Sequence, residues 1–399
     1  MKRLIFLFTL PALLLVSCKT TNNTYTIAGT TTYEVNEGDP VYLRCGDISD
    51  TTTVAADGSF SFTGTVDAPQ VGAVQIMNGS KKMMYAYLVL EPGTLNVEIS
   101  PRSTVSGTPL NEALTAYEVR KRDRADERRA ALKAVQEYDA WSAEEKDTKA
   151  AAIWDKYYED ANALYSEIFA AHPDDAIGAD ALMSLAETRE QFDSLYSLAG
   201  ENAKKYPRIV KEVARYARLD KTAPGARFTD FTIENGNADG TPVKFSDYVG
   251  QGKYVLVDFW ASWCGPCKAE MPNLKAVYEK YKGDQFELVG VAVWDKREDT
   301  EKAVPELGIT WPVIYDAQRV PTEIYGINGI PHIILSGPGG PILARERVSA
   351  TIINVTSSRG IFLGFMRREA KGLPCLAMKS RTFRDIEPGG QITASGYNF

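Results

Sequence analysis

The spacing of hydrophobic and polar residues changes along the chain and divides it into regions. Between residues 24 and 105, short alternating runs such as Ser59–Thr63 and Leu95–Ile99 are separated by turn pairs such as Asp57-Gly58. Alternation with a period of two predicts half-buried strands, and an Asp-Gly pair favours a hairpin turn. We therefore expect an antiparallel β-sandwich-like domain over residues 24–105.

From residue 106 to residue 220, the hydrophobic spacing changes to the period of amphipathic helices. Thr108 followed by Pro109 is typical of a helix start, because the first helical position does not need the N–H that proline lacks. Ser142 and Glu145 have the spacing of a capping box for a second helix. Further helices are expected over residues 176–188, 190–199 and 207–218. No motif in this helical segment indicates catalysis.

Residues 221–347 alternate between apolar runs of strand type and helical patterns. The run from Tyr254 to Trp260 predicts a buried strand, although it contains one acid, Asp258. Phe286–Val293 predicts a second buried strand with helical patterns before and after it. Strands that alternate with helices, followed by a hairpin, predict an α/β domain with a mixed sheet and helices on both faces.

The sequence Cys264-Gly265-Pro266-Cys267 directly follows the first of these buried strands and begins a helical pattern. The first N–H groups of a helix have no helical partner and lie at the positive end of its dipole, so they stabilise a thiolate at Cys264. The pKa of a thiol in such a motif falls from about 8.5 to roughly 3.5–7.5. Cys267 lies one turn further along the same face, where it can resolve a mixed disulfide. The motif therefore predicts thiol–disulfide exchange.

Two other uses of a cysteine pair do not fit the sequence. A zinc site takes about four ligands, but the chain has 2 histidines and no second Cys-x-x-Cys. Covalent haem attachment needs a histidine after the second cysteine, where this chain has Lys268. We therefore expect neither a metal ion nor a cofactor.

The N-terminus has the pattern of an export signal. A basic start precedes an apolar run from Leu4 to Val16, which is too short to span a bilayer because a spanning helix takes about 20 residues. We interpret residues 1–17 as a signal peptide. The sequence Leu15-Val-Ser-Cys18 resembles the lipobox of bacterial lipoproteins, which implies that Cys18 carries a lipid and that residues 18–23 form a tether.

The chain has 52 acidic and 45 basic residues and a formal net charge of −7. An acidic chain without basic clusters argues against a nucleic-acid partner and against electrostatic binding to a membrane. The lipid is then the expected membrane anchor, on the periplasmic side of the cell envelope. Of the remaining cysteines, Cys45 is expected to be a small core residue, and Cys375 is taken as adventitious.

The segment Val257–Lys268, with the sequence Val-Asp-Phe-Trp-Ala-Ser-Trp-Cys-Gly-Pro-Cys-Lys, resembles the thioredoxin signature. The hairpin before it, Glu270-Met-Pro after it and the lipobox are similar to the TlpA/ResA branch of extracytoplasmic thiol–disulfide reductases. This resemblance covers about residues 223–347 and implies a thioredoxin fold there. Residues 24–105 resemble the β domain of unknown function that precedes thioredoxin-like domains in Bacteroidetes lipoproteins.

The resemblance implies a role for each matching residue. Cys264 is the attacking thiol, Cys267 is the resolving thiol, and Asp258 matches the buried acid that accepts and returns the proton of Cys267. Glu270 matches the active-site glutamate of the ResA branch. Ile330-Pro331 matches the cis-proline segment that faces the cysteines. Substrate contacts are expected from Trp263, Gly265, Pro266, Ile330 and Pro331.

Several of these residues also have a simpler interpretation. Burial of an acid raises its pKa, which suits Asp258 to proton transfer near neutral pH, whereas the alternative is a hydrogen-bonded structural role. Glu270 is either an active-site acid or an ordinary surface glutamate. His332 stands where the family usually has a small polar residue, and we expect it to pack rather than to transfer protons. Pro272 is expected to kink the active-site helix.

Residues 348–399 depart from the thioredoxin pattern, which has a final amphipathic helix at this point. Either a different segment covers that face of the sheet, or the reading frame changes near residue 348. Sequencing the gene through codon 348 distinguishes the two interpretations.

The sequence thus predicts a lipid-anchored reductase of protein disulfides that is supplied by an upstream thiol electron donor, in cytochrome c maturation or redox homeostasis. The Gly-Pro dipeptide resembles the reducing members, although the motif itself leaves the direction open. One alternative is a peroxiredoxin-like antioxidant enzyme, but Val257 and Ala261 stand where its Pro-x-x-x-Thr/Ser-x-x-Cys pattern needs proline and a hydroxyl. The other alternative is a non-enzymatic cell-envelope binding protein with a redox switch.

Overall fold

The computed structural model describes residues 23–77 and 83–346. The chain divides into two compact units, Met1–Ala217 and Arg218–Phe399. The predicted signal peptide, Cys18 and the tail after residue 347 with Cys375 lie outside the described residues.

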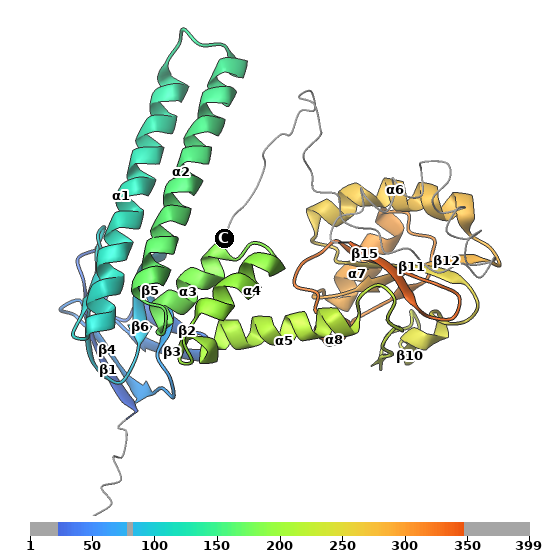
Figure 1. The fold of residues 1–399 in the computed structure, drawn as a ribbon, viewed down its shortest axis with the longest axis horizontal. Helices are drawn as coiled ribbons and strands as arrows, with labels where there is room; N and C mark the ends of the chain where they lie inside the picture. Colours follow the sequence, from blue (N-terminus) through green and yellow to red (C-terminus); the bar gives the residue numbers. More distant parts are fainter. Residues whose placement is uncertain (1–22, 78–82, 347–399) are drawn as a thin grey trace, which may run out of the picture. The chain divides into compact units, whose positions relative to one another are not determined.

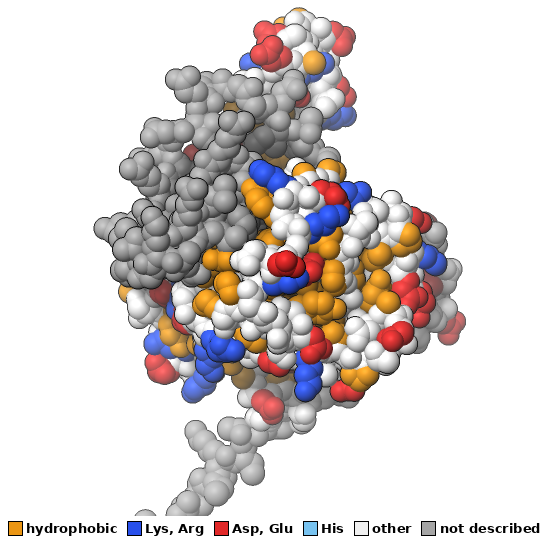
Figure 2. Space-filling model, turned by 90° about the vertical axis from the view of Figure 1, so that its right-hand side faces the viewer, with side chains coloured by type: hydrophobic (Ala, Val, Ile, Leu, Met, Phe, Trp, Pro, Cys, Tyr) orange, Lys and Arg blue, Asp and Glu red, His pale blue; other side chains and the backbone are white. Residues whose placement is uncertain are grey.

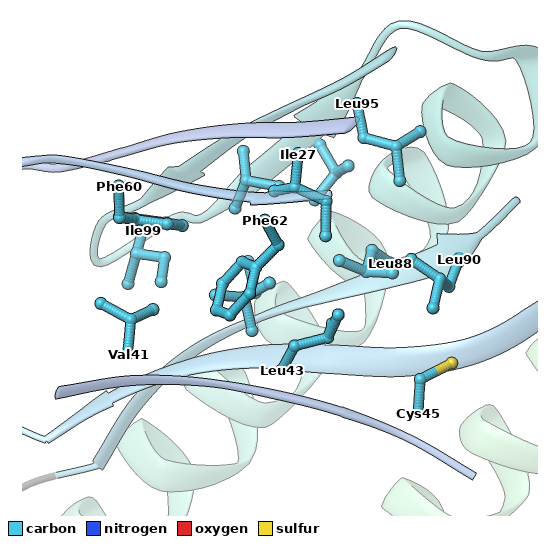
Figure 3. Packing of buried hydrophobic residues seen from close by; sticks show 14 of the residues in the cluster. Ile27, Val41, Leu43, Cys45, Phe60, Phe62, Leu88, Leu90, Leu95 and Ile99 are labelled. Carbon is cyan, nitrogen blue, oxygen red and sulfur yellow. The ribbon is translucent and has the colours of Figure 1, made fainter. Parts of the chain in front are cut away.

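The first unit begins with two four-stranded sheets, whose orders are β4-β1-β7-β8 and β3-β2-β5-β6. Their inward residues form one apolar core, to which Ile27, Leu43 and Leu88 contribute (Figure 3). This arrangement confirms the predicted sandwich. The strands are β1 Thr24–Thr31, β2 Pro40–Cys45, β3 Ile48–Thr53, β4 Ser59–Thr65, β5 Gln70–Met77, β6 Met83–Leu90, β7 Gly93–Ile99 and β8 Thr104–Ser106.

One strand pairing differs from the antiparallel expectation, because β1 pairs with β7 in parallel. After β4, the chain crosses to the second sheet for β5 and β6, and it then returns on the other side of β1 in the same direction. A long crossover is what permits a parallel pair. The local alternation of hydrophobic residues does not indicate that β7 pairs with β1 or in which direction.

The free thiol of Cys45 lies in this core. The residue is 1% exposed, and its Sγ donates to the carbonyl of Gln70 at 3.2 Å. Burial raises the pKa of the Cys45 thiol to about 12. Cys45 is therefore a packed and unreactive residue, as the sequence predicts.

Two long helices, α1 (Pro109–Glu137) and α2 (Ala143–Ala171), run side by side as a hairpin (Figure 1). The capping box that begins α2 is present: the Glu145 N–H donates to Ser142 Oγ at 3.2 Å, and the Ser142 N–H donates to Glu145 Oε2 at 2.8 Å. The shorter helices follow as α3 Ala176–Leu185, α4 Arg189–Leu198, η1 Ala203–Lys205 and α5 Pro207–Lys221.

The helices are joined to the sandwich through a buried side chain. Asn111 on α1 is fully buried, its Oδ1 accepts the N–H of Val89 at 2.9 Å, and its Nδ2 donates to the carbonyl of Val89 at 2.8 Å. The amide thus pairs with both backbone groups of one residue in β6. This contact is one of several that join the helices to the strands in this unit, together with the bond from the Thr115 hydroxyl to the Val105 carbonyl at 2.7 Å.

The second unit is built around a five-stranded mixed sheet in the order β13-β12-β11-β14-β15. The central strand β11 is buried along its whole length, pairs in parallel with β12 and pairs antiparallel with β14. The sheet strands are β11 Tyr254–Trp260, β12 Phe286–Ala292, β13 Val313–Ile314, β14 His332–Ser336 and β15 Ile342–Glu346. A hairpin of β9 (Thr232–Ile233) and β10 (Val243–Lys244) precedes them, with η2 (Phe245–Asp247) after it.

Each face of this sheet has its own apolar cluster. Helices α6 (Gly265–Tyr281) and α7 (Arg297–Glu306) contribute to one cluster, whereas α8 (Val320–Tyr325) and the β9–β10 hairpin contribute to the other. This confirms the α/β thioredoxin-like fold with helices on both faces. Pro272 lies inside α6.

The surface carries charges of both signs. On the face shown in Figure 2, acidic and basic side chains lie among hydrophobic ones, without a broad area of one sign. Within the part of the chain that the structure describes, no helix combines the length and the apolar character needed to cross a bilayer.

Candidate active site

The sulfur of Cys264 lies at the start of helix α6. Cys264 is the N-cap residue, and its Sγ accepts a hydrogen bond from the N–H of Cys267 at 3.1 Å. The two cysteines form a disulfide bond, so the structure represents the oxidised protein. Cys264 is 3% exposed and Cys267 is 1% exposed, while Gly265 and Pro266 between them are exposed. The exposed part of the motif is therefore at Gly265 and Pro266, next to the Cys264 sulfur.

Asp258 lies on the same face of the sheet as the two cysteines. Side chains alternate along β11, and its residues Leu256 and Trp260 belong to the apolar cluster that contains Cys264 and Cys267. Asp258 is 2% exposed. Burial raises the pKa of Asp258 to about 7, and the negative charge of Glu270 adds to this rise. A carboxyl with such a pKa can accept and return a proton near neutral pH.

Glu270 follows Cys267 by one turn of α6 and is half-buried. Its Oε1 accepts a hydrogen bond from Asn273 Nδ2 at 2.9 Å. Because its charge acts on Asp258, the side chain is electrostatically connected to the buried acid. This observation favours the active-site interpretation of Glu270 over that of an ordinary surface glutamate.

The peptide bond between Ile330 and Pro331 is cis, as the resemblance implies. The strand after it, β14, begins with His332 opposite Phe259 near the end of β11. Pro331 therefore lies at the edge of the sheet where β11 continues towards Cys264. Backbone at this edge can pair with an extended substrate segment.

His332 is 8% exposed, and its ring lies 6.2 Å from that of Phe259. Its Nε2 lies 3.2 Å from Nη2 of Arg345. A guanidinium can only donate, so Nε2 accepts and the imidazole is neutral in this arrangement. This geometry fits the packing role expected for His332.

Trp263 and Trp260 have different environments. Trp263 is 59% exposed next to Cys264, and its Nε1 donates to the carbonyl of Trp294 at 2.9 Å. Trp260 is fully buried in the core below. Trp263 therefore lies at the rim of the site, and Trp260 belongs to the core.

A second loop contacts the segment before Cys264, and sequence reasoning did not single it out. The buried carboxylate of Asp295 accepts hydrogen bonds from the N–H and the hydroxyl of Ser262, at 2.6 and 2.9 Å. Asp295 follows β12, and parallel strands have their carboxyl ends at the same edge of a sheet. The pair Trp294-Asp295 directly after a buried strand was the available signal in the sequence.

Among the described residues, no cluster of three or more His, Cys, Asp or Glu side chains has the arrangement of a metal site. The groups that the structure places at this site are the dithiol and the two carboxyl groups of Asp258 and Glu270. A disulfide at the start of a helix, at the carboxyl end of a central strand and beside a cis-proline edge, defines a thioredoxin-like redox protein.

Comparison with known proteins agrees with this class. The model of the AhpC/TSA family matches residues 224–345, and that of a domain of unknown function, DUF4369, matches residues 25–114. The thiol-disulfide oxidoreductase ResA of Oceanobacillus iheyensis is 31% identical over 133 residues, which are 33% of this chain and 67% of the relative. The ResA of Bacillus subtilis is 28% identical over 130 residues, which are 33% of this chain and 70% of the relative.

Among solved structures, the thioredoxin domain of a thiol-disulfide oxidoreductase from Bacteroides vulgatus is 34% identical in sequence, with a TM-score of 0.30. The match covers 34% of this chain and 96% of the Bacteroides vulgatus chain. The sequence relatives show the family. This chain belongs to the ResA-type thiol-disulfide oxidoreductases, which are thioredoxin-like enzymes.

Proposed function

We propose that this chain reduces disulfide bonds in other proteins, with the Cys264/Cys267 couple as the electron carrier. The observation that most supports this is the Cys264 sulfur at the N-cap of α6, 3.1 Å from the N–H of Cys267. N–H groups at a helix N-terminus favour negative charge. The same position therefore stabilises a Cys264 thiolate once the disulfide has opened.

In the proposed cycle, an upstream thiol donor first reduces the disulfide to two thiols. The Cys264 thiolate then attacks one sulfur of a substrate disulfide, breaks that S–S bond and forms a mixed disulfide, and the released substrate sulfur takes up a proton. Cys267, after losing its proton, attacks the Cys264 sulfur and releases the second substrate thiol. Two electrons have then passed to the substrate, and the internal disulfide is restored.

Asp258 is the proposed acceptor of the Cys267 proton. It lies on the face of the sheet that carries the dithiol, and its raised pKa makes the ionised carboxylate a stronger base than an exposed aspartate. Glu270 strengthens this basicity, because its negative charge disfavours a second negative charge on Asp258.

Protein disulfides are the proposed substrates because the surroundings of the site are open and apolar. Trp263 presents an exposed ring, Gly265 and Pro266 are exposed, and the edge at Ile330-Pro331 offers backbone for pairing. An extended segment around a substrate cysteine fits such a surface.

The test is reduction of insulin, with an apocytochrome c peptide as a second substrate for a role in cytochrome c maturation. Cys264→Ser is expected to abolish reduction of both. Cys267→Ser is expected to accumulate mixed disulfides, because the resolving thiol is missing. Cys45→Ala is the matched control, since it removes a buried cysteine outside the site and should leave the rate unchanged. Reduction by Cys264→Ser at the rate of the unmodified protein would refute the proposal.

We also propose that a lipid on Cys18 holds the protein on the periplasmic side of the envelope. This rests on the apolar run from Leu4 to Val16 and on the lipobox-like sequence before Cys18. Cys18→Ser is expected to move the exported protein from the membrane fraction to the soluble fraction. Retention of the variant in the membrane would contradict the anchor.

Peroxide reduction is the second candidate, because the family model that matches residues 224–345 is that of the AhpC/TSA family. Val257 and Ala261 stand where the peroxiredoxin pattern has proline and a hydroxyl. We therefore expect no consumption of hydrogen peroxide beyond that of a free thiol. Rapid consumption that needs Cys264 would favour this second candidate.

A further inference from the structure

The segment between β11 and the first cysteine is held by one side chain from another loop. Asp295 Oδ2 accepts the Ser262 N–H at 2.6 Å and the Thr300 hydroxyl at 2.8 Å. Asp295 Oδ1 accepts the Ser262 hydroxyl at 2.9 Å and the Lys296 N–H at 3.0 Å. The carboxylate thus joins the segment before Cys264 to the start of α7.

The residue before Asp295 contacts the same segment. The carbonyl of Trp294 accepts the indole N–H of Trp263 at 2.9 Å. Two consecutive residues of the β12–α7 loop therefore bind two consecutive residues, Ser262 and Trp263, directly before Cys264. Such paired contacts restrict both the position and the rotation of that segment relative to the β12–α7 loop.

This loop is itself fixed by unusual backbone. Among the described residues, the non-glycine positions with positive φ are Trp294 at 54°, Asp316 at 52° and Gln318 at 47°. The three are connected, because the Trp294 N–H donates to the Gln318 carbonyl at 3.4 Å and Gln318 Nε2 donates to Asp316 Oδ1 at 2.7 Å. Gln318 Nε2 also donates to the Asp295 carbonyl at 2.6 Å. Left-handed backbone at non-glycine residues is unfavourable and concentrates at functional sites.

We propose that Asp295 is a positioning residue that keeps Cys264 at the N-terminus of α6 after the disulfide has been reduced. In the oxidised protein, the Cys264–Cys267 bond itself holds the two ends of the motif together. In the dithiol form that link is absent, and the contacts of Asp295 and Trp294 remain to hold residues 262–263. This inference rests on the proposed thiol–disulfide exchange at Cys264. It means that the β12–α7 loop helps to stabilise the Cys264 thiolate.

The side-chain chemistry makes Asp295→Asn a sharp test. Each carboxylate oxygen accepts one backbone N–H and one hydroxyl, and a hydroxyl can reverse its role whereas an N–H cannot. Asparagine has one accepting oxygen, so its amide nitrogen must face the N–H of either Ser262 or Lys296. The substitution therefore removes one of the two backbone contacts through which this side chain joins the segment before Cys264 to the start of α7, without changing the side-chain volume.

The experiment measures alkylation of Cys264 by iodoacetamide against pH in the reduced full-length protein, with the modified cysteine identified by mass spectrometry. Asp295→Asn is expected to move the midpoint to higher pH and, at pH values below the midpoint, to lower the thiolate fraction by about three- to tenfold. Removal of a negative charge alone would move the midpoint to lower pH. A lower or unchanged midpoint would therefore overturn the proposal. Asp258, Lys268 and Glu270 are retained in every variant.

Two further variants complete the test. Asp230→Asn is the matched control, because Asp230 accepts the N–H groups of Phe231 and Ser246 at 3.0 and 2.8 Å in the same unit, and it should leave the midpoint unchanged. Ser262→Ala removes one contact and keeps the charge of Asp295, so a smaller shift to higher pH is expected. If Asp295→Asn does not fold, a missing shift in Ser262→Ala overturns the proposal.

Alkylation also separates this inference from the proposed function, because it needs no substrate. A protein that fails to reduce insulin but shows the shift would refute the reductase and leave the role of Asp295 in place. Unfolding of the variants in both redox forms provides the structural control. A positioning role predicts that the substitutions lower the stability of the reduced form more than that of the oxidised form.

Discussion

Asp258 lies directly opposite Gly290 in the register of the parallel strands β11 and β12. The buried carboxyl therefore has a cross-strand neighbour without a side chain, which can supply neither a cation nor a hydrogen-bond donor from that position. This relationship agrees with the direction of the Asp258 pKa, which burial and then the charge of Glu270 raise to about 7.

The first prediction concerns stability against pH. A carboxyl with a pKa of about 7 in the folded chain and about 3.9 in the unfolded chain binds its proton more tightly when folded, so stability falls as pH rises between these values, by about 4 kcal/mol. Asp258→Asn is expected to remove this loss. Urea unfolding of the oxidised protein should show the variant more stable at pH 8, with the difference shrinking towards pH 4. A difference that does not depend on pH would contradict the assignment.

The second prediction concerns the base strength of Asp258. Glu270→Gln removes a negative charge that raises the pKa of Asp258, so the pH profile of disulfide reduction should move to lower pH. Glu279→Gln is the matched control on the same helix, because Glu279 pairs with Lys282 at 2.7 Å. Identical profiles for the two variants would show that Glu270 has no special connection to the site.

The third prediction concerns the space at Gly290. A Cβ there would lie 3.1 Å from Trp260 Nε1 and 3.4 Å from Trp311 Nε1, and both side chains are buried. Gly290→Ala is expected to destabilise the oxidised protein by about 1–3 kcal/mol through overpacking. Gly339→Ala is the control, since its nearest contact would be at 3.9 Å. Equal thermal midpoints for the two variants would show that the core adapts without cost.

The fourth prediction concerns the first unit. Asn111→Ala leaves the buried N–H and carbonyl of Val89 without their partner, at a cost of about 2–4 kcal/mol in the free energy of unfolding. Asn162→Ala, at an exposed position on α2, should cost less than about 0.5 kcal/mol. Chemical denaturation followed by circular dichroism distinguishes the two, and similar losses would argue against Asn111 as the link between helix and sheet.

Local pattern predicts the elements of the site well, because each is encoded by neighbouring residues. The apolar run before Cys264 and the helical pattern after it specify a strand that leads into a helix, and the structure has both. The parallel pairing of β1 with β7 and the contact of Asp295 with Ser262 join residues far apart in the sequence. Such contacts depend on the order of the strands in a sheet. The local spacing of hydrophobic residues does not specify that order.

The buried thiol of Cys45 has a consequence for maturation. A cysteine enters a wrong disulfide bond as its thiolate, not as its thiol. The pKa of about 12 leaves almost no Cys45 thiolate at neutral pH. Domains fold as units, with the N-terminal ones first. The sandwich precedes Cys264 and Cys267 in the chain, so it folds around Cys45 first and removes that thiol as a competitor for their bond formation.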